Sequence, residues 1–354
     1  MSCPARLYPL RQPKNHRLPI PGWKLRFPSG ISHVYTAYIG IQQHADHQAA
    51  LEAKDDAISA VQAWLKAEEP SAFERFNVID GSDIHNAAVW VCYWTDPAKF
   101  KQSLDSLSLP SLYNRLPASG STSVGIWRES FASEISRLET NYSGLDYLPG
   151  LARIPDTTTD EHSFSAYWGA ARDRIPDSAH DLFPKSPNAG VASIPRGIGQ
   201  YLVGINYDNL VHIRSGQFWD NCSQDEADAY ERKLEPTLQS GLEYLWSNPR
   251  ETGAYGLRYL GNEGTRKETC GAGFFTSLET LEEWAKTHRS HLAIYRGALL
   301  HYKAFGDRRK LRTWHEVSVL RDGDAKFEYV NCVPSTGVIQ GVPLEVVNDC
   351  LPSV

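Results

Sequence analysis

The chain has 354 residues, of which 41% are hydrophobic and 22% are charged, and its formal net charge is −6 at pH 7. This length allows two modest domains or one duplicated domain with a large core. The acidic balance argues against nucleic acid as a partner, because binding to phosphate backbones needs clustered cations. No apolar run approaches the roughly 18 residues that a membrane span requires, so no membrane partner is expected.

The cysteines are scattered and form neither a C-x-x-C pair nor a C-x-x-C-H haem-attachment motif: Cys3, Cys92, Cys222, Cys270, Cys332 and Cys350. The first residues lack the apolar core of a signal peptide. We therefore expect reduced thiols in a cytoplasmic protein. Any haem would be held without a thioether link to such a motif.

The first third of the chain mixes an extended segment with alternating strands and helices. Residues 1–30 are rich in proline and predict an extended arm that packs along a surface, not a helix or a central strand. The composition predicts strands over residues 31–42 and 85–94 and a helix over residues 49–66. Asp96, followed by proline, predicts the start of another helix.

A strand that passes into a capped helix recurs along the chain. It appears at residues 89–97, again at residues 203–243, and again at residues 271–279. Within the second of these, Ser223 and Glu226 have the spacing of a capping box. Strands and helices that alternate in two similar halves indicate α+β units of split βαβ type.

Residues 143–160 combine glycine, proline and threonine, which is typical of an inter-domain linker. We therefore expect the arm at residues 1–30 to be followed by a first α+β unit over residues 31–150. A second unit would then span residues 151–354.

The segment with the candidate histidine ligands begins with Thr276 and Glu279, which have the spacing of a capping box. The apolar spacing then predicts one helix that continues through Tyr295. Its apolar side includes His288 near the centre and His291 at the edge. Helical spacing alone does not choose between these two imidazoles as a ligand.

A strand over residues 311–320 follows this helix. Alternation places His315 on the same face as Leu311 and Val317. A helix and a strand that both present imidazole to the interior are able to build a metal or haem site. A single histidine on an apolar face is more often a core residue that is hydrogen-bonded to the backbone.

Two further polar positions stand out upstream. Ser215 ends a strand that begins at Leu210, and the chain is expected to turn at Gly216. Its hydroxyl is able to reach a pocket or to satisfy its own backbone. No G-x-S-x-G elbow surrounds it, so a hydrolase nucleophile is not expected. Residues 167–176 place Trp and Gly before two arginines, a pattern that also suits an ordinary loop with Arg–Asp pairing.

Several short motifs occur in a fixed order over essentially the whole chain: Pro21–Pro28, Tyr38–Gln42, Arg137–Thr140 with Asp146–Gly150, Tyr167–Pro176, Ile213–Gln217, His288–Ile294 and Trp314–Val317. Together they resemble the motifs of the aldoxime dehydratases. The resemblance implies haem b as the cofactor and a fold of duplicated ferredoxin-like units, of the dimeric α/β-barrel type, assembled as a homodimer. It implies dehydration of an aldoxime, R–CH=N–OH, to a nitrile and water, with the substrate nitrogen bound to ferrous iron.

The resemblance also assigns expected roles by position. It makes His291 the iron ligand and His315 the acid near the substrate hydroxyl. Ser215 would hydrogen-bond the oxime oxygen, Arg174 would assist proton delivery, and Glu139 matches a carboxylate beside them. An acid suits this reaction, because cleavage of the N–O bond expels hydroxide, which is a poor leaving group.

The chain departs from the family pattern near the expected pocket. Arg289 stands between the two histidines where proline is usual, and Phe218 stands where an acidic residue usually precedes Trp219. The preference between aryl and alkyl aldoximes therefore stays open.

Three other interpretations stay open beside the aldoxime dehydratase. A haem peroxidase-like enzyme of the dimeric α/β-barrel type would use a similar distal arginine and histidine. A non-catalytic haem-binding or sensor protein would show a haem spectrum without turnover. A zinc hydrolase is the weakest of them, because the spacing from His288 to His291 lacks the glutamate of an H-E-x-x-H motif.

Overall fold

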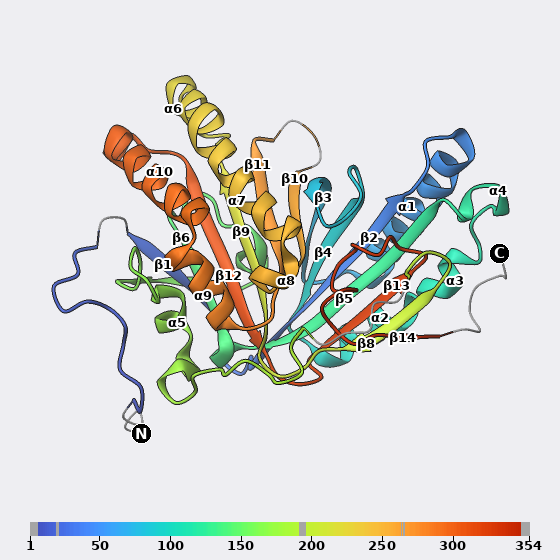
Figure 1. Cartoon of the computed structure of the whole chain (residues 1–354), viewed down its shortest axis with the longest axis horizontal. Coiled ribbons are helices and arrows are strands. Elements are labelled where there is room, and N and C mark those ends of the chain that lie inside the picture. The colour runs from blue at the N-terminus through green and yellow to red at the C-terminus, as the bar shows by residue number, and fades with distance from the viewer. Residues whose placement is uncertain (1–5, 19–20, 191–195, 263, 265, 348–354) are drawn as a thin grey trace.

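The computed structural model describes residues 6–18, 21–190, 196–262, 264 and 266–347. Its strands form one sheet in the order β14-β8-β13-β5-β2-β4-β3-β10-β11-β9-β12-β6-β1-β7. The paired strands run antiparallel throughout this order. Figure 1 shows the sheet opened into two wings with helices along their outer sides. The α+β class predicted from the sequence is therefore confirmed.

The strands are β1 (Gly22–Arg26), β2 (His33–Gln43), β3 (Ala72–Gly81), β4 (Ala88–Trp94), β5 (Val124–Glu134), β6 (Leu138–Tyr142), β7 (Thr158–His162), β8 (Tyr201–Ile205), β9 (Leu210–Phe218), β10 (Ala254–Asn262), β11 (Glu268–Phe275), β12 (Arg312–Leu320), β13 (Ala325–Val330) and β14 (Glu345–Val346). The α-helices are α1 (Gln48–Glu68), α2 (Pro97–Ser106), α3 (Leu109–Tyr113), α4 (Ala118–Ser121), α5 (Ala170–Arg174), α6 (Gln224–Ala229), α7 (Glu235–Ser247), α8 (Pro249–Thr252), α9 (Leu278–Thr287) and α10 (Arg289–Phe305).

The two wings meet where β3 pairs with β10. The first wing runs from β14 to β3 and the second from β10 to β7. Each wing contains strands from early and late parts of the chain, since β8 and β13 join the first wing while β1 and β6 join the second. The division into units at residue 150 stays a prediction.

The same order of elements occurs once in each wing. In the first wing it is β2, α1, β3, β4, the helices α2 to α4, and β5. In the second wing it is β9, the helices α6 and α7, β10, β11, the helices α9 and α10, and β12. Gly40 on β2 pairs with Trp127 on β5, and Gly216 on β9 pairs with Trp314 on β12. The same glycine–tryptophan pair therefore occurs between the first and last strands of each set.

A central core packs the inner faces of the two wings together. Tyr38 and Phe131 of the first wing meet His212 and Phe274 of the second, with ring centroids 5.3 Å apart for Tyr38–His212 and 6.1 Å apart for Phe131–Phe274. A separate core fills the helix side of the first wing with Trp64, Trp90, Trp94 and surrounding aliphatic side chains. The helix side of the second wing has a smaller core and, as described below, a cavity.

Most of the local elements predicted from the sequence are confirmed. The strands β2, β4 and β12 and the helix α1 lie within a few residues of their predicted bounds. Asp96 caps α2 by accepting hydrogen bonds from the backbone amides of Ala98 and Lys99, at 2.7 and 3.2 Å. None of the helices in the described ranges is long and apolar enough to cross a membrane. Cys92, Cys222, Cys270 and Cys332 are free thiols, while Cys3 and Cys350 lie outside the described residues.

The prediction that the N-terminal arm contributes no central strand is wrong. β1 lies inside the sheet, paired with β7 along its length and with β6 through Trp23 and Tyr142. Its prolines do not prevent this, because Pro21 and Pro28 flank the strand and leave the backbone amides between them free to pair. Residues 1–5 and 19–20 of the arm lie outside the described part.

The single helix predicted from Thr276 to Tyr295 is in fact two helices. The first is capped by Ser277 together with Thr280, not by Thr276 with Glu279. The helix is interrupted at His288, whose backbone is extended. The Nδ1 atom of His288 accepts a hydrogen bond from the backbone amide of Ser290 at the start of α10. The imidazole thus acts as a helix cap, which is a local use that the apolar periodicity does not reveal.

Two other local predictions are also wrong. The expected capping box at Ser223 does not form, although a helix begins there, because the Glu226 carboxylate accepts the amides of Lys310 and Leu311 instead. The expected turn at Gly216 is absent, and β9 continues to Phe218.

Gly216 is needed for packing and not for a turn. A Cβ atom at this position would lie 2.3 Å from Cε2 of Trp314 on the neighbouring strand. Interior packing leaves little room for such a shift. The indole of Trp314 therefore occupies the space that a side chain at this position would need.

We expect Gly216→Ala to lower the free energy of unfolding by on the order of 1–3 kcal/mol, because the added methyl group overpacks the contact with Trp314. The measurement is urea unfolding followed by tryptophan fluorescence. Gly297→Ala is the control, since its Cβ would meet Leu234 at an ordinary 3.8 Å within α10. That variant should match the parent or gain up to about 1 kcal/mol from helix propensity. Equal stability of the two variants would contradict the packing role.

Candidate active site

A cavity of about 750 Å³ lies between the sheet of the second wing and its helices α7, α9 and α10. Its lining is mainly apolar, with leucines and aromatic rings from these helices. A few polar and charged side chains converge on it from the sheet and the adjoining loops. Such a combination is typical of a binding site for a small molecule or cofactor.

The floor of the cavity is a row of residues across four strands. Asn141 on β6 pairs with His315 on β12, which pairs with Ser215 on β9, which pairs with Gly271 on β11. All four line the cavity. Ser215 and His315 are thus directly opposite each other, and within the described residues the hydroxyl of Ser215 has no hydrogen-bond partner, so it is available to a bound molecule.

His315 forms a charged cluster with Glu139 and Arg174. Its Nε2 lies 2.6 Å from Nη2 of Arg174 and 3.1 Å from Oε1 of Glu139. Arg174 Nε also donates to Oε2 of Glu139 at 2.7 Å. The structure therefore brings together three of the predicted site residues from β6, α5 and β12.

The cluster offers the His315 ring two alternative hydrogen bonds at one nitrogen. A guanidinium only donates, so Nε2 accepts from Arg174 in the neutral tautomer that carries its proton on Nδ1, whereas in the other neutral tautomer Nε2–H donates to Glu139. In the first arrangement Glu139 Oε1 has no partner among the described residues. A protonated ring donates from Nε2 to Glu139 instead, and Nδ1 is then the N–H that remains available to a bound molecule.

Glu139 is fully buried but stays ionised. Burial raises its pKa, while the charges of Arg174 and His315 and their hydrogen bonds lower it more strongly, to about 2. Glu139 thus keeps a fixed negative charge 3.1 Å from Nε2 of His315, where it is able to accept a hydrogen bond from the ring.

Arg174 is held in place by the loop before it. Its Nη1 donates to the carbonyl of Phe164. The preceding residue, Asp173, accepts hydrogen bonds from the hydroxyl of Tyr167 at 2.7 Å and from the backbone amide of Arg11 at 2.9 Å. The guanidinium is thus fixed before any ligand binds.

His291 lies on the helix side of the cavity. Its Nδ1 donates to the carbonyl of Ala285 at 2.7 Å, and its ring packs against Trp284 and Trp168. Burial lowers the pKa of His291, although the bond to Ala285 opposes this. The ring is therefore neutral at pH 7, with the Nε2 lone pair free, which is the arrangement that a metal-binding histidine normally has.

His288 does not share this environment. Its ring stacks on Tyr244, with centroids 3.9 Å apart and planes 14° apart, and it does not line the cavity. Within the described residues, no group of three or more His, Cys, Asp and Glu side chains is arranged to hold a metal ion. The geometry offers no zinc-hydrolase site there, whereas a haem needs only one protein ligand on this side.

The sequence profile of a family described as haem-containing dehydratase matches residues 37–338. The chain belongs to this family. Among curated relatives, an aliphatic aldoxime dehydratase of Pseudomonas chlororaphis is 32% identical, over 96% of both chains. A phenylacetaldoxime dehydratase of Bacillus sp. (strain OxB-1) is 30% identical, over 92% of this chain and 93% of the relative.

Solved structures of similar proteins agree with this assignment. A crystal structure of an aldoxime dehydratase superposes with a TM-score of 0.84 at 30% identity, covering 96% of both chains. A second aldoxime dehydratase, co-crystallised with butyraldoxime, gives a TM-score of 0.82 at 29% identity, covering 96% of this chain and 94% of that one. The whole dehydratase fold is therefore shared.

The cavity of this haem-containing dehydratase fits its cofactor. The Nε2 of His291 would hold the haem iron, and the lining around it is mainly apolar, which suits a porphyrin. The row with Ser215 and His315 faces the same space from the sheet. Haem is the cofactor, and the donors present suit it.

The motifs did not single out two polar residues near the site of this dehydratase. Asn141 follows Glu139 by two residues on β6, so strand alternation would have placed it on the same face. His162 on β7 is buried, and its pKa is lowered to about 4 by burial and by the positive charge of Arg174. Its Nδ1 accepts the amide of Phe164 at 3.2 Å. The neutral ring thus holds the loop that also fixes Arg174.

The reverse face of the same strands carries a second polar pair. Glu316 is opposite Arg214 in register, one residue beyond the pair formed by His315 and Ser215. Glu316 Oε1 accepts the hydroxyl of Tyr142 at 3.1 Å and the amide of Leu151 at 2.7 Å. Burial raises the pKa of Glu316 to about 7, although the charge of Arg214 opposes this.

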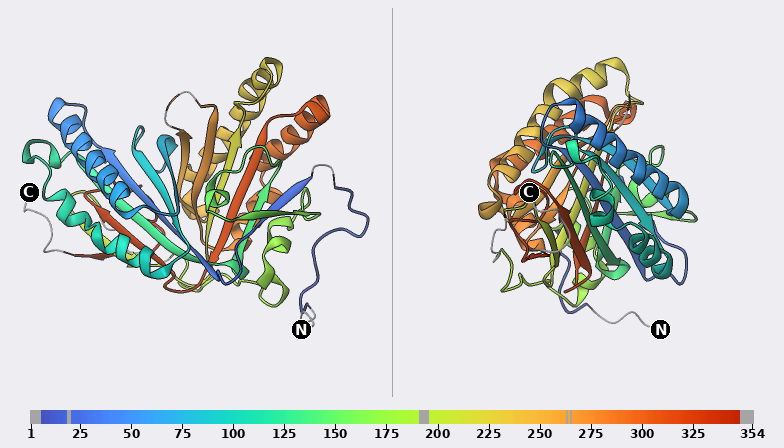
Figure 2. Two further views of the ribbon diagram at one scale, coloured as in Figure 1. Left: turned by 180° about the vertical axis from the view of Figure 1, so that it is seen from behind. Right: turned by 90° about the vertical axis from the view of Figure 1, so that its right-hand side faces the viewer.

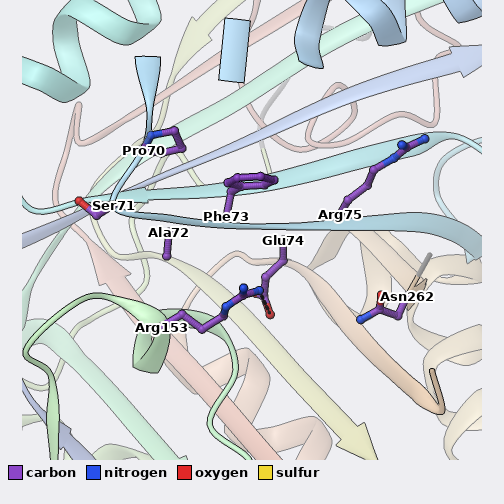
Figure 3. Close-up of a pocket in the computed structure, with 8 residues that line it drawn as sticks. All are labelled: Pro70, Ser71, Ala72, Phe73, Glu74, Arg75, Arg153 and Asn262. Atoms are coloured by element: carbon purple, nitrogen blue, oxygen red, sulfur yellow. Dashed lines mark ion pairs between the residues drawn. The ribbon is translucent and has the colours of Figure 1, made fainter. Parts of the chain in front are cut away.

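A second hollow of about 490 Å³ opens on the surface at the junction of the wings. Figure 3 shows Arg153 extending towards Glu74 on β3, and their charged atoms are 3.8 Å apart. Glu74 also accepts from the buried Arg214 at 2.7 Å. None of the predicted site residues lines this hollow, so it is the outer end of the reverse-face network and not part of the candidate active site.

We expect Glu316→Gln to gain stability relative to the parent as pH rises. The folded-state pKa of about 7 lies above the ordinary value of 4.5, so the stability from protonated Glu316 is complete below pH 4.5 and is lost as pH rises through 7. The neutral amide avoids this loss, which is on the order of 2–3 kcal/mol between pH 5 and pH 8. Urea unfolding at both pH values measures it.

The exposed Glu52→Gln on α1 is the control, because its amide still accepts the bond from Gln48. Its difference from the parent should be the same at pH 5 and pH 8. A pH-independent difference for Glu316→Gln as well would show that Glu316 does not retain its proton in the folded chain.

Proposed function

We propose that this chain is a lyase that dehydrates aldoximes, R–CH=N–OH, to nitriles and water in the haem-containing cavity of the second wing. The observation that carries the proposal is the His315 cluster with Glu139 and Arg174, which faces the same cavity as the free Nε2 of His291. Relatives over nearly the full length are named aliphatic and phenylacetaldoxime dehydratases.

His291 would hold the cofactor through Nε2. When bound, ferrous haem b would supply an electron-rich iron able to coordinate the oxime nitrogen and to weaken the N–O bond. The carbonyl of Ala285 keeps the imidazole in the required tautomer.

Side chains of the protein carry out both proton transfers of the reaction. Protonated His315 gives a proton from Nδ1 to the oxime oxygen, so that water leaves instead of hydroxide. Ser215 holds that oxygen from the neighbouring strand, and Arg174 and Glu139 fix the His315 ring through Nε2. The neutral His315 then removes the proton on carbon, which leaves the nitrile and restores the imidazolium.

This proton balance closes within one turnover. One proton passes from His315 to oxygen and one returns from carbon, so R–CH=N–OH becomes R–C≡N and H₂O with no net change in the enzyme. The ionised Glu139 accepts the Nε2–H of the His315 ring throughout the cycle. The mainly apolar lining suits an apolar R group, alkyl or arylalkyl.

The finer architecture is also part of the proposal. Each wing contains β-α-β-β-α-β elements with the strands in the same spatial order, β5-β2-β4-β3 and β12-β9-β11-β10, which supports a duplicated ferredoxin-like fold of the dimeric α/β-barrel type. Assembly as a homodimer belongs to the same proposal. The free thiols of the described cysteines support a cytoplasmic location.

We expect His315→Ala to keep its haem and to lose about 10²–10⁴-fold in kcat, because the acid and base of the reaction are removed. Nitrile formation from phenylacetaldoxime by the dithionite-reduced enzyme under anaerobic conditions measures this, together with the Soret band. The exposed His180→Ala is the control and should be fully active. Full turnover by His315→Ala would exclude the acid role.

We expect His291→Ala to lose the Soret band of bound haem, and His288→Ala to retain it, because His291 lines the helix side of the cavity whereas His288 stacks on Tyr244 outside it. Absorption spectra after haem reconstitution measure both variants. Retention of the band by His291→Ala together with its loss by His288→Ala would reverse the ligand assignment. No band in the parent protein would remove haem from the proposal altogether.

Ser215→Ala should bind both haem and aldoxime but turn over about 10²–10³-fold more slowly, because one donor to the oxime oxygen is lost. A shift of the Soret band on aldoxime addition reports binding separately from nitrile formation. A Soret band in the parent without nitrile would favour the sensor interpretation, and faster turnover of hydrogen peroxide than of aldoxime would favour the peroxidase-like one.

A further inference from the structure

We propose that Arg11 and Lys286 form a cationic rim that binds the propionate carboxylates of the haem. Arg11 belongs to the N-terminal strap, which we define as residues 6–17. The inference rests on the proposed function only in requiring haem in this cavity. It assigns a binding role to a segment that lies far from the site residues in sequence. In Figure 2 the strap runs beside the second wing.

The cations of the cavity lining are Arg11, Arg174 and Lys286. Arg174 is already used by Glu139, His315 and the carbonyl of Phe164. The other two lie at the edge of the cavity beside α9. Arg11 binds Glu282 through Nη1 only, and the Lys286 ammonium has no partner among the described residues, so both retain N–H groups for an anion that enters with an otherwise apolar ligand.

At this edge of the cavity, three cationic side chains surround one carboxylate, that of Glu282. Its carboxylate accepts Nε and Nη2 of Arg172, at 3.0 and 2.7 Å, and also Nη1 of Arg11, at 2.9 Å. Lys286 lies four residues further along α9, on the same face, where it would ordinarily pair with Glu282. Within the described residues it forms no ion pair, because that carboxylate already binds two guanidinium groups.

The strap holds Arg11 in position before a ligand arrives. The amides of Leu7 and Tyr8 donate to the carbonyl of Ala179, at 2.9 and 3.0 Å. The amides of Arg11 and Gln12 donate to the carboxylate of Asp173, at 2.9 and 3.1 Å. These bonds fix the backbone of Arg11 beside α5, so that Arg11 and Lys286 line the same cavity although they are far apart in sequence.

Gly169 shows how closely the strap is packed. Its φ is +95°, and a Cβ atom there would lie 2.5 Å from Cδ of Arg11. Glycine therefore both permits the backbone conformation and makes room for the arginine stem. The stem passes over Gly169 and brings the guanidinium to the cavity edge.

The chemistry of haem fits this rim. A haem carries two carboxylates on one edge of an apolar ring, and a carboxylate buried without a partner is costly. A rim that is open to water avoids that cost, since the Arg11 side chain is 45% exposed and Lys286 is exposed. Arg11 also supplies a planar guanidinium, which is well suited to a carboxylate.

The test is the rate of haem transfer from the reconstituted holoprotein to excess apomyoglobin. Arg11→Gln and Lys286→Gln are compared with Arg17→Gln, an exposed arginine on the same strap without a partner among the described residues. Each rim variant should lose haem about 5- to 10-fold faster than the parent, as expected for a partly exposed charged hydrogen bond. Arg17→Gln should match the parent.

The same measurement with haem dimethyl ester separates charge from packing. The ester lacks free carboxylates, so the parent and both rim variants should release it at equal rates. A faster loss of the ester from Arg11→Gln would show that the residue acts through strap packing and would overturn the proposal. Unchanged haem release by both rim variants, or failure of the parent to bind haem, would overturn it as well.

This design does not depend on turnover. A parent that binds haem, shows the rim effect and forms no nitrile would disprove the dehydratase function while supporting the rim. A parent that forms nitrile but shows no rim effect would do the reverse. The two hypotheses are therefore tested independently.

Discussion

The pairing register of β9 and β12 is the constraint on which the site depends. It sets Ser215 opposite His315 on the cavity face and Arg214 opposite Glu316 on the reverse face. A slip of one residue would exchange the two faces, placing imidazole and hydroxyl in the central core. The contact of Trp314 with Gly216 lies beside both pairs and has no room for such a slip. Packing in the core thereby fixes the chemistry at the cavity.

The pKa of a buried carboxyl group is shifted in opposite directions on the two faces of the sheet. Glu139 is surrounded by Arg174 and His315, so its pKa falls to about 2 in spite of burial. Glu316 lies near Arg214, whose guanidinium is bound to Glu74, so burial prevails and the pKa of Glu316 rises to about 7. The cavity face therefore keeps a permanent anion beside the imidazole of His315, whereas the carboxyl group of Glu316 on the reverse face holds its proton to a higher pH. Partner number, not burial alone, decides which state each carboxyl group adopts.

Local patterns in the sequence predicted what local physics controls. Strand alternation placed His315 and Ser215 on an apolar face, and the α+β class followed from alternating elements. The break at His288 was missed because a side-chain cap ended the helix, and periodicity does not contain that information. Glu139 and Arg174 carry no local signal at all, since their meeting with His315 depends on long-range pairing of β6 with β12 and on the docking of α5. Only the family resemblance pointed to them.

The first wing shows why the second contains a cavity. With the pairs Gly40–Trp127 and Gly216–Trp314 as landmarks, the next row of the first wing is Arg128, Ile39 and Trp90, while that of the second is His315, Ser215 and Gly271. Trp90 and Ile39 fill the space beneath the helices of the first wing, and Arg128 is neutralised by Glu328. Glycine and serine at the matching positions leave that space open in the second wing. The backbones of the two wings are therefore similar in this region. The cavity of the second wing results from smaller side chains in one row of the sheet.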